Sequence, residues 1–303
     1  IITVLIVISI IFSGRKLGEY IYGYKNITSN ISGYILIILI LSIIANSLIS
    51  YGINGHLIIR LIISSIIIYG LYKIKNTKKQ IHKIFSKLIR TSSDLKTFEK
   101  VIGLILIINI INLFLLSLSP PTDADSLDYH LGVPLLWIQN LNQFPLDGWL
   151  HSRIIGLGEA INYIGLVYGT DILGQVIQYS GLWIVFLSFF HLSNNKRHIL
   201  LFGLLVFCIP LNLSLVASQK PFVFPSAVMF YGFILFIKEN NYPDKKLFYI
   251  PLIFICYGIA CKYSFIIPGA ISIFYIGLIA FKKNILPKFI LALIVAASIT
   301  IIP

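Results

Sequence analysis

The run GYILIILILSIIANSLISY, residues 33–51, decides the fold class of this chain. It contains no charged residue, and Ile and Leu fill most of its positions. A stretch of this length crosses the hydrocarbon core of a bilayer as a helix, because a helix satisfies its own backbone hydrogen bonds there. Residues 33–51 therefore predict a transmembrane helix.

Similar apolar runs recur along the whole chain. The chain is 57% hydrophobic and 12% charged, with a mean hydropathy of +0.91, whereas soluble domains are about 25% charged. This composition excludes a soluble enzyme, a disordered protein and a secreted disulfide scaffold. The predicted spans lie at residues 1–13, 33–51, 57–74, 101–118, 172–192, 199–217, 221–237, 247–261, 263–281 and 285–303. We therefore expect an all-α, polytopic bundle of about ten transmembrane helices.

The distribution of basic residues supports this set of spans. If successive spans alternate in direction, 20 of the 24 Lys and Arg fall on one side of the membrane. The other side keeps only Arg60, Arg153, Lys220 and Lys262. Cytoplasmic loops carry an excess of Lys and Arg, so the basic side is predicted to be cytoplasmic. The net charge of +13 then reflects topology, and we expect a bacterial inner-membrane protein with no nucleic-acid partner.

By composition the chain divides into three segments. Residues 1–74 are predicted to form an N-terminal extension of three spans. Residues 75–100 form a basic cytoplasmic segment whose apolar residues recur at helical spacing. Residues 101–303 form the predicted transmembrane core. Because the chain begins with Ile1 and ends at Pro303 inside an apolar run, we expect a fragment that is truncated at its C-terminus.

The acidic residues concentrate in the longest predicted outer segment, residues 119–171, which holds six of the eleven Asp and Glu. If a helix begins at Asp125, then Asp125 and Asp128 lie on one face of it. Asp123 or Asp125 could cap its N-terminus. A carboxylate at the lipid–water boundary is suited to act as a general base for a hydroxyl or an amine. The other interpretation is that these acids only cap a helix and face water.

His130 lies among these acids and has three interpretations: a base, a metal ligand or a hydrogen-bonding spacer. The set Asp125, Asp128 and His130 could bind Mg²⁺ or Mn²⁺, since carboxylates and imidazole are ligands for such ions. No cofactor follows from the sequence, and a divalent cation stays an open alternative.

The sequence DSLDYHLGVPLLWIQNLNQFPLDGWLHSRIIGLGEAINYIG, residues 125–165, resembles the first outer loop of polytopic glycosyltransferases of the GT-C type. That family includes the protein mannosyltransferases and the aminoarabinose transferases. The positions that match are Asp125, Tyr129, His130, Leu131, Pro134, Trp137, Ile138, Gln139, Arg153 and Glu159. Residues 214–236 and residues 257–270 resemble two further outer turns of the same enzymes.

The resemblance implies a GT-C-like core in residues 101–303, with the catalytic loop 119–171 on the periplasmic side. The donor would be a sugar on a polyprenyl phosphate, and the acceptor a glycan, a lipid or a protein. Asp125 would deprotonate the acceptor with support from Asp128 and His130, and the sugar would be transferred with inversion. The residues expected to bind substrate are Tyr129, Arg153, Glu159, Lys220, Lys262 and Tyr263.

An anionic leaving phosphate needs cations on the outer side of the membrane. Arg binds phosphate through a planar pair of donors, and Lys acts as a point charge. We therefore assign Arg153, Lys220 and Lys262 to the phosphate or to pairing with the acids. Glu159 either pairs with Arg153 or contacts the sugar.

The alternative function is a transporter, flippase or polymerase of surface polysaccharide. A transporter is expected to place charges or broken helices near the bilayer midplane. In this sequence the charges gather in one outer segment instead, and this favours the enzyme.

Overall fold

The computed structural model describes residues 1–93, 96–140, 156–190, 192–193, 195–239 and 249–300. Within these ranges all regular structure is helical, which confirms the all-α class. The longer helices are α1 (Ile2–Tyr22), α2 (Ile27–Ser50), α3 (His56–Ser93), α4 (Thr97–Ser117), α7 (Leu173–Phe189), α8 (Lys196–Phe207), α10 (Val223–Glu239), α11 (Tyr249–Cys261), α12 (Ile266–Lys282) and α13 (Leu286–Thr300). The shorter elements are η1 (Ser126–Leu131), α5 (Gly132–Asn140), α6 (Glu159–Val167), α9 (Pro210–Val216) and η3 (Tyr263–Phe265).

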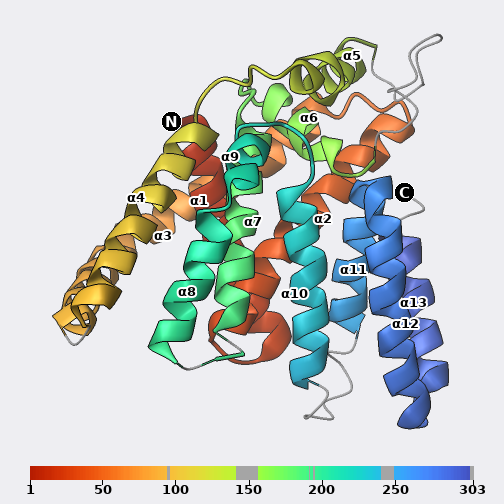
Figure 1. Cartoon of the computed structure of the whole chain (residues 1–303). Coiled ribbons are helices and arrows are strands. Elements are labelled where there is room, and N and C mark those ends of the chain that lie inside the picture. Colours follow the sequence, from red (N-terminus) through yellow and green to blue (C-terminus); the bar gives the residue numbers. More distant parts are fainter. Residues whose placement is uncertain (94–95, 141–155, 191, 194, 240–248, 301–303) are drawn as a thin grey trace.

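The helices lie side by side between two ends of the molecule, and the short helices α5, α6 and α9 gather at the upper end (Figure 1). Helix α1 packs against α2 and α3, and α10 packs against both α7 and α11. Helix α3 runs without a break from the third predicted span into the basic segment 75–100, as far as Ser93. Each predicted span overlaps one of these helices or, at 199–217, the pair α8 and α9.

The apolar helices indicate a membrane protein. Four of them are long and apolar enough to cross a bilayer: α2, the first part of α3 (His56–Ile74), α4 and the segment Tyr263–Lys282. The pair α8 and α9, bent by 57°, makes up to five if it counts as one span. This number is lower than the predicted number of about ten spans. Helices α7, α10, α11 and α13 are shorter than 18 residues, and α1 carries the charged residues Arg15, Lys16 and Glu19.

Helices α1 and α2 touch through glycine. A Cβ atom added to Gly18 would lie 1.7 Å from the backbone oxygen of Ser29, and one added to Gly33 would lie 1.8 Å from that of Gly14. Backbones this close leave no room for a side chain at the crossing. Gly14 and Gly18 thus form the small-residue spacing with which membrane helices approach closely.

Replacing Gly18 by Ala should destabilise the α1–α2 crossing, because the new methyl group would overlap the backbone of α2. Overpacking of this kind costs about 1–3 kcal/mol or more. Thermal melting of the purified protein in detergent measures the effect. Gly103→Ala in α4 is the matched control, since a Cβ there meets nothing within 4 Å among the described residues. Equal melting temperatures for the two variants would contradict the close crossing.

The largest buried core joins α1, α2 and α3 to α6, α7, α10 and α11. A polar contact crosses the same interface. The hydroxyl of Tyr231 donates to the backbone oxygen of Thr28 at 3.0 Å and lies 3.0 Å from the hydroxyl of Ser32. The predicted N-terminal extension, residues 1–74, therefore shares one core with helices of the predicted segment 101–303.

Candidate functional site

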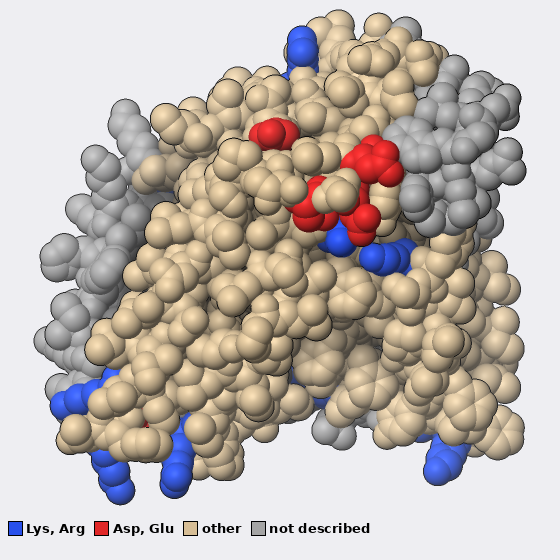
Figure 2. Space-filling view, turned by 45° about the horizontal axis from the view of Figure 1, so that its top comes forward, with Lys and Arg blue, Asp and Glu red and all other residues tan. Residues whose placement is uncertain are grey.

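Four stretches of chain meet at the upper end of the bundle. They are the start of η1, the start of α6, the turn 217–222 before α10, and the turn at Lys262 between α11 and η3. The start of α6 is tied to α11, because Leu157 N donates to Ala260 O at 3.0 Å. Acidic side chains gather at this end beside basic ones, and other basic side chains line the opposite edge of the molecule (Figure 2).

Asp123 caps the first turn that follows the upper end of α4. Its Oδ1 accepts from the backbone N of Ser126 at 3.0 Å, whereas Asp125 makes no capping hydrogen bond to the described residues. The turn η1 is a π-helix that continues directly into α5. Single π turns of this kind are frequent at functional sites. A helix thus begins at the predicted place, with Asp123 at its N-terminus.

Lys220 pairs with both carboxylates. Its Nζ lies 2.8 Å from Asp125 Oδ2 and 3.5 Å from Asp123 Oδ1. The hydrogen bond from Lys220 holds the pKa of Asp125 below its usual range, and the same contact raises the pKa of Lys220. Burial opposes the shift at Asp123, but hydrogen bonds from Ser126 and Lys220 still lower its pKa. The Asp125 side chain is 54% exposed, so a ligand can reach the pair.

A buried hydrogen-bond network holds the turn that carries Lys220. Ser126 Oγ accepts from Gln219 N at 2.8 Å. Asn162 Nδ2 donates to His130 O at 2.9 Å and to Gln219 O at 3.1 Å. Because these side chains are buried, the network fixes the position of Lys220 relative to η1 and α6.

His130 and Glu159 form a second, buried pair. His130 Nδ1 lies 2.9 Å from Glu159 Oε1, and their side chains are 3% and 4% exposed. Glu159 Oε2 also accepts from Gly156 N at 3.1 Å. His130 Nε2 is buried and has no hydrogen-bond partner among the described residues. The carboxylate of Glu159 thus fixes the orientation of the imidazole ring.

Lys262 is another cation near this site. Its Nζ lies 5.2 Å from the centroid of the Phe222 ring. Burial lowers the pKa of Lys262, and the nearby charge of Glu159 opposes that shift. Tyr263 next to it is 62% exposed. The ring of Tyr129 lies 4.1 Å from that of His130, centroid to centroid, and burial raises the pKa of the Tyr129 hydroxyl.

The structure brings many of the predicted site residues to one end. Lys220 was assigned either to the phosphate or to pairing with the acids, and the structure shows it paired with the acids. Glu159 contacts His130, which neither interpretation of Glu159 included. Arg153 lies outside the described residues. Among the described residues, no group of three His, Cys, Asp or Glu is arranged to hold a metal ion, so the divalent cation stays a prediction that rests on sequence.

The sequence analysis did not single out Asn162, Gln219 or Ser126, which position the site. Each is an ordinary polar residue in apolar surroundings, and its partners lie far away in the sequence. The sequence marks these three residues only by their polarity. A buried polar side chain in an apolar bundle needs a hydrogen-bond partner, so a polar residue in an apolar run is a candidate for such a network.

Residues 25–302 match the family described as the DUF1420 N-terminal domain. The match covers most of the chain, so the chain belongs to this family. No curated protein and no solved structure matches it.

Proposed function

We propose that this member of the DUF1420 family is a membrane glycosyltransferase of the GT-C type. It moves a sugar from a polyprenyl-phosphate donor to a glycan, lipid or protein acceptor on the outer face of the membrane. The observation that carries the proposal is the contact between Asp125 and Lys220, which places a carboxylate beside a cation at the end of an apolar bundle. The resemblance of residues 125–165 to GT-C loops supports the same reaction.

In the proposed reaction Asp125 takes the proton from the acceptor hydroxyl. The acceptor oxygen bonds to the anomeric carbon, and the bond from that carbon to the phosphate oxygen breaks. The electron pair of that bond leaves with the phosphate, whose charge Lys220 and Lys262 stabilise. Attack from the face opposite the phosphate inverts the anomeric configuration.

The same arrangement couples donor binding to the strength of the base. Without donor, Lys220 keeps the pKa of Asp125 low. A donor phosphate competes with Asp125 for the ammonium group, because it also accepts charge-assisted hydrogen bonds. Once Lys220 turns to the phosphate, the pKa of Asp125 rises toward about 3.9, the ordinary value for aspartate. A higher pKa makes Asp125 a stronger base at the moment when the donor is present.

The other predicted residues complete this assignment. Asp128 supports Asp125 or holds a divalent cation, and Glu159 positions His130. A group of three is assigned to the sugar and its phosphate: Tyr129, Arg153 and Tyr263. The protein would need no other cofactor.

We place this end on the periplasmic side of the bacterial inner membrane, with all of the about ten apolar segments crossing the bilayer. Arg15 and Lys16 lie in the second half of α1, and Lys25 lies in the turn between α1 and α2. The excess of basic residues at that opposite end supports this orientation, since cytoplasmic loops are rich in Lys and Arg.

The bend between α8 and α9 favours a second candidate, a transporter, flippase or polymerase of surface polysaccharide. Transporters bind substrates at discontinuous helices, and the two axes differ by 57°. The acids and their two cations lie at one end of the bundle rather than midway along it, which favours the transferase.

A mass-spectrometric comparison of cells with and without the intact gene tests both candidates. A transferase predicts that the lipid-linked sugar donor accumulates without the gene and that the acceptor lacks one sugar. A flippase predicts that a complete lipid-linked glycan accumulates instead. Unchanged surface glycans and unchanged lipid-linked sugars would contradict both candidates.

Replacing Lys220 by Gln should shift the acid limb of the kcat/KM profile to higher pH. The base works only when it is deprotonated, and removal of the ammonium lets the pKa of Asp125 rise from its lowered value. The pH profile of kcat/KM reports groups of the free enzyme. Lys220→Arg, which keeps the charge, should retain the low acid limb. If K220Q and wild type share one acid limb, then Asp125 is not the base that titrates.

A further inference from the structure

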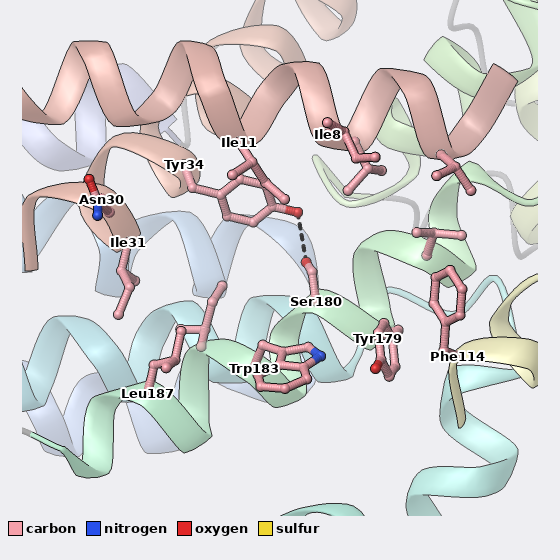
Figure 3. A pocket seen from close by; sticks show the side chains of 14 residues that line it. Ile8, Ile11, Asn30, Ile31, Tyr34, Phe114, Tyr179, Ser180, Trp183 and Leu187 are labelled. Carbon is pink, nitrogen blue, oxygen red and sulfur yellow. Dashed lines mark hydrogen bonds between the residues drawn. The ribbon is translucent and has the colours of Figure 1, made fainter. Parts of the chain in front are cut away.

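A cavity of about 450 Å³ lies between α1, α2, α4 and α7. Figure 3 shows it as a slot, with Ile8 and Ile11 of α1 facing Trp183 and Leu187 of α7. Phe114 of α4 lies at one end of the slot (Figure 3).

The lining offers almost nothing to a polar ligand. The hydroxyl of Tyr34 donates to Ser180 Oγ at 2.8 Å, and the hydroxyl of Tyr179 donates to Ile110 O at 3.2 Å. Those groups are therefore already satisfied. Apolar cavities of this kind stay dry. The exception is Asn30 at one end of the slot, whose Oδ1 is buried and has no partner among the described residues.

The length of the cavity indicates what kind of ligand it can bind. It follows α7 from Val176 to Leu187, a distance of about 16 Å at the helical rise per residue. That length is close to half of the bilayer core, which is about 30 Å thick. A slot of this length that is lined almost entirely by apolar side chains matches a single hydrocarbon chain.

We propose that this slot binds one acyl chain of an anionic phospholipid from the cytoplasmic leaflet. Asn30 lies one turn from the start of α2, at the end of the bundle where Arg15, Lys16 and Lys25 surround the single carboxylate of Glu19. Three cations around one acid leave an excess of positive charge for a lipid phosphate. The Asn30 amide then meets the glycerol region, and the chain extends along α7.

This site is separate from the one at the upper end. It rests on the proposed orientation in the membrane and not on the proposed reaction. On α7, the residues that face the polar turn before α10 are different ones. Gln178 Oε1 accepts from Phe222 N at 3.2 Å and from Phe224 N at 2.8 Å. Helix α7 thus stands between the lipid slot and the candidate catalytic residues.

Photolabelling of the full chain in lipid nanodiscs tests the proposal. The probe is phosphatidylglycerol with a diazirine in one acyl chain, and labelled peptides are mapped by mass spectrometry. The variant Ile8→Phe with Leu187→Phe fills the slot from two half-buried positions. The matched control is Ile271→Phe with Leu278→Phe, on a face of α12 where the side chains are 64% and 45% exposed.

We expect labelling to concentrate on α1 and α7 and to fall about fivefold in the filled variant, a change of about 1 kcal/mol. The α12 control should keep the wild-type pattern, and unlabelled phosphatidylglycerol should compete better than phosphatidylcholine. Melting of each variant reports whether it is folded. If the filled variant does not fold, the wild-type map and the competition decide the question alone.

Three results would overturn the proposal. The first is equal labelling of α1, α7 and the exposed face of α12. The second is undiminished labelling of a folded, filled variant. The third is recovery of an isoprenoid lipid, instead of a phospholipid, bound to the purified wild-type protein.

Discussion

Replacing Asp125 by Asn should abolish sugar transfer and leave the protein folded and inserted. The amide cannot take the acceptor proton, and general acid–base catalysis contributes about 10²–10⁴-fold to the rate. We therefore expect a loss of at least about a hundredfold. The Asp125 side chain is 54% exposed and Asn can still accept a hydrogen bond from Lys220, so the fold should not change.

The measurement is the release of polyprenyl phosphate from a synthetic donor by the purified protein in nanodiscs. Asp171→Asn is the control, because Asp171 is another exposed acid of the same predicted outer segment. We expect wild-type release from that variant. Full activity of D125N would refute Asp125 as the base, and an inactive D171N would show that any loss of acid at this end is harmful.

Asp128→Asn separates the two roles proposed for the second carboxylate. If Asp128 only supports Asp125, the variant should lose less activity than D125N at any concentration of Mg²⁺ or Mn²⁺. If Asp128 holds a divalent cation, added metal should partly restore the rate. If the variant is as active as wild type without any added metal, then Asp128 has neither role.

The all-helical architecture could be predicted from hydropathy alone. The run 33–51 predicts a helix where α2 spans Ile27–Ser50, and the run 172–192 predicts one where α7 spans Leu173–Phe189. A bilayer imposes this outcome, because an apolar segment has no other way to satisfy its backbone. The bend at Pro210 is harder to predict from the sequence, because proline determines where a helix breaks but not the angle between its two parts.

The candidate site was only partly predictable from the sequence, as the pairs Asp125–Lys220 and His130–Glu159 illustrate. Counting charges placed Asp125 and Lys220 on the same side of the membrane, and the structure adds their contact at 2.8 Å. Counting charges does not predict the pairing of His130 with Glu159, because both lie in one long predicted outer segment that holds other acids. Their contact depends on how η1 and α6 pack together, and only tertiary structure decides that.

Replacing Glu159 by Ala should destabilise the whole upper end of the bundle. The carboxylate has contacts with His130 Nδ1 at 2.9 Å and Gly156 N at 3.1 Å, and its side chain is 4% exposed. Removing it leaves a buried imidazole nitrogen and a part-buried backbone N–H without this partner, and an unpaired buried group costs about 1–3 kcal/mol. Gln keeps both contacts only if its oxygen accepts from Gly156 N and its amide group donates to an unprotonated His130 Nδ1.

Thermal melting in detergent measures this loss, and Glu99→Ala is the matched control. Glu99 accepts one backbone N–H, that of Lys96, at the exposed start of α4, so its removal should cost only about 0.5–1 kcal/mol. A double-mutant cycle with His130→Ala isolates the pair itself. Because the two side chains touch, we expect a coupling energy of at least about 1 kcal/mol. Strictly additive losses would show that Glu159 acts through Gly156 alone, and that His130 takes its orientation from elsewhere.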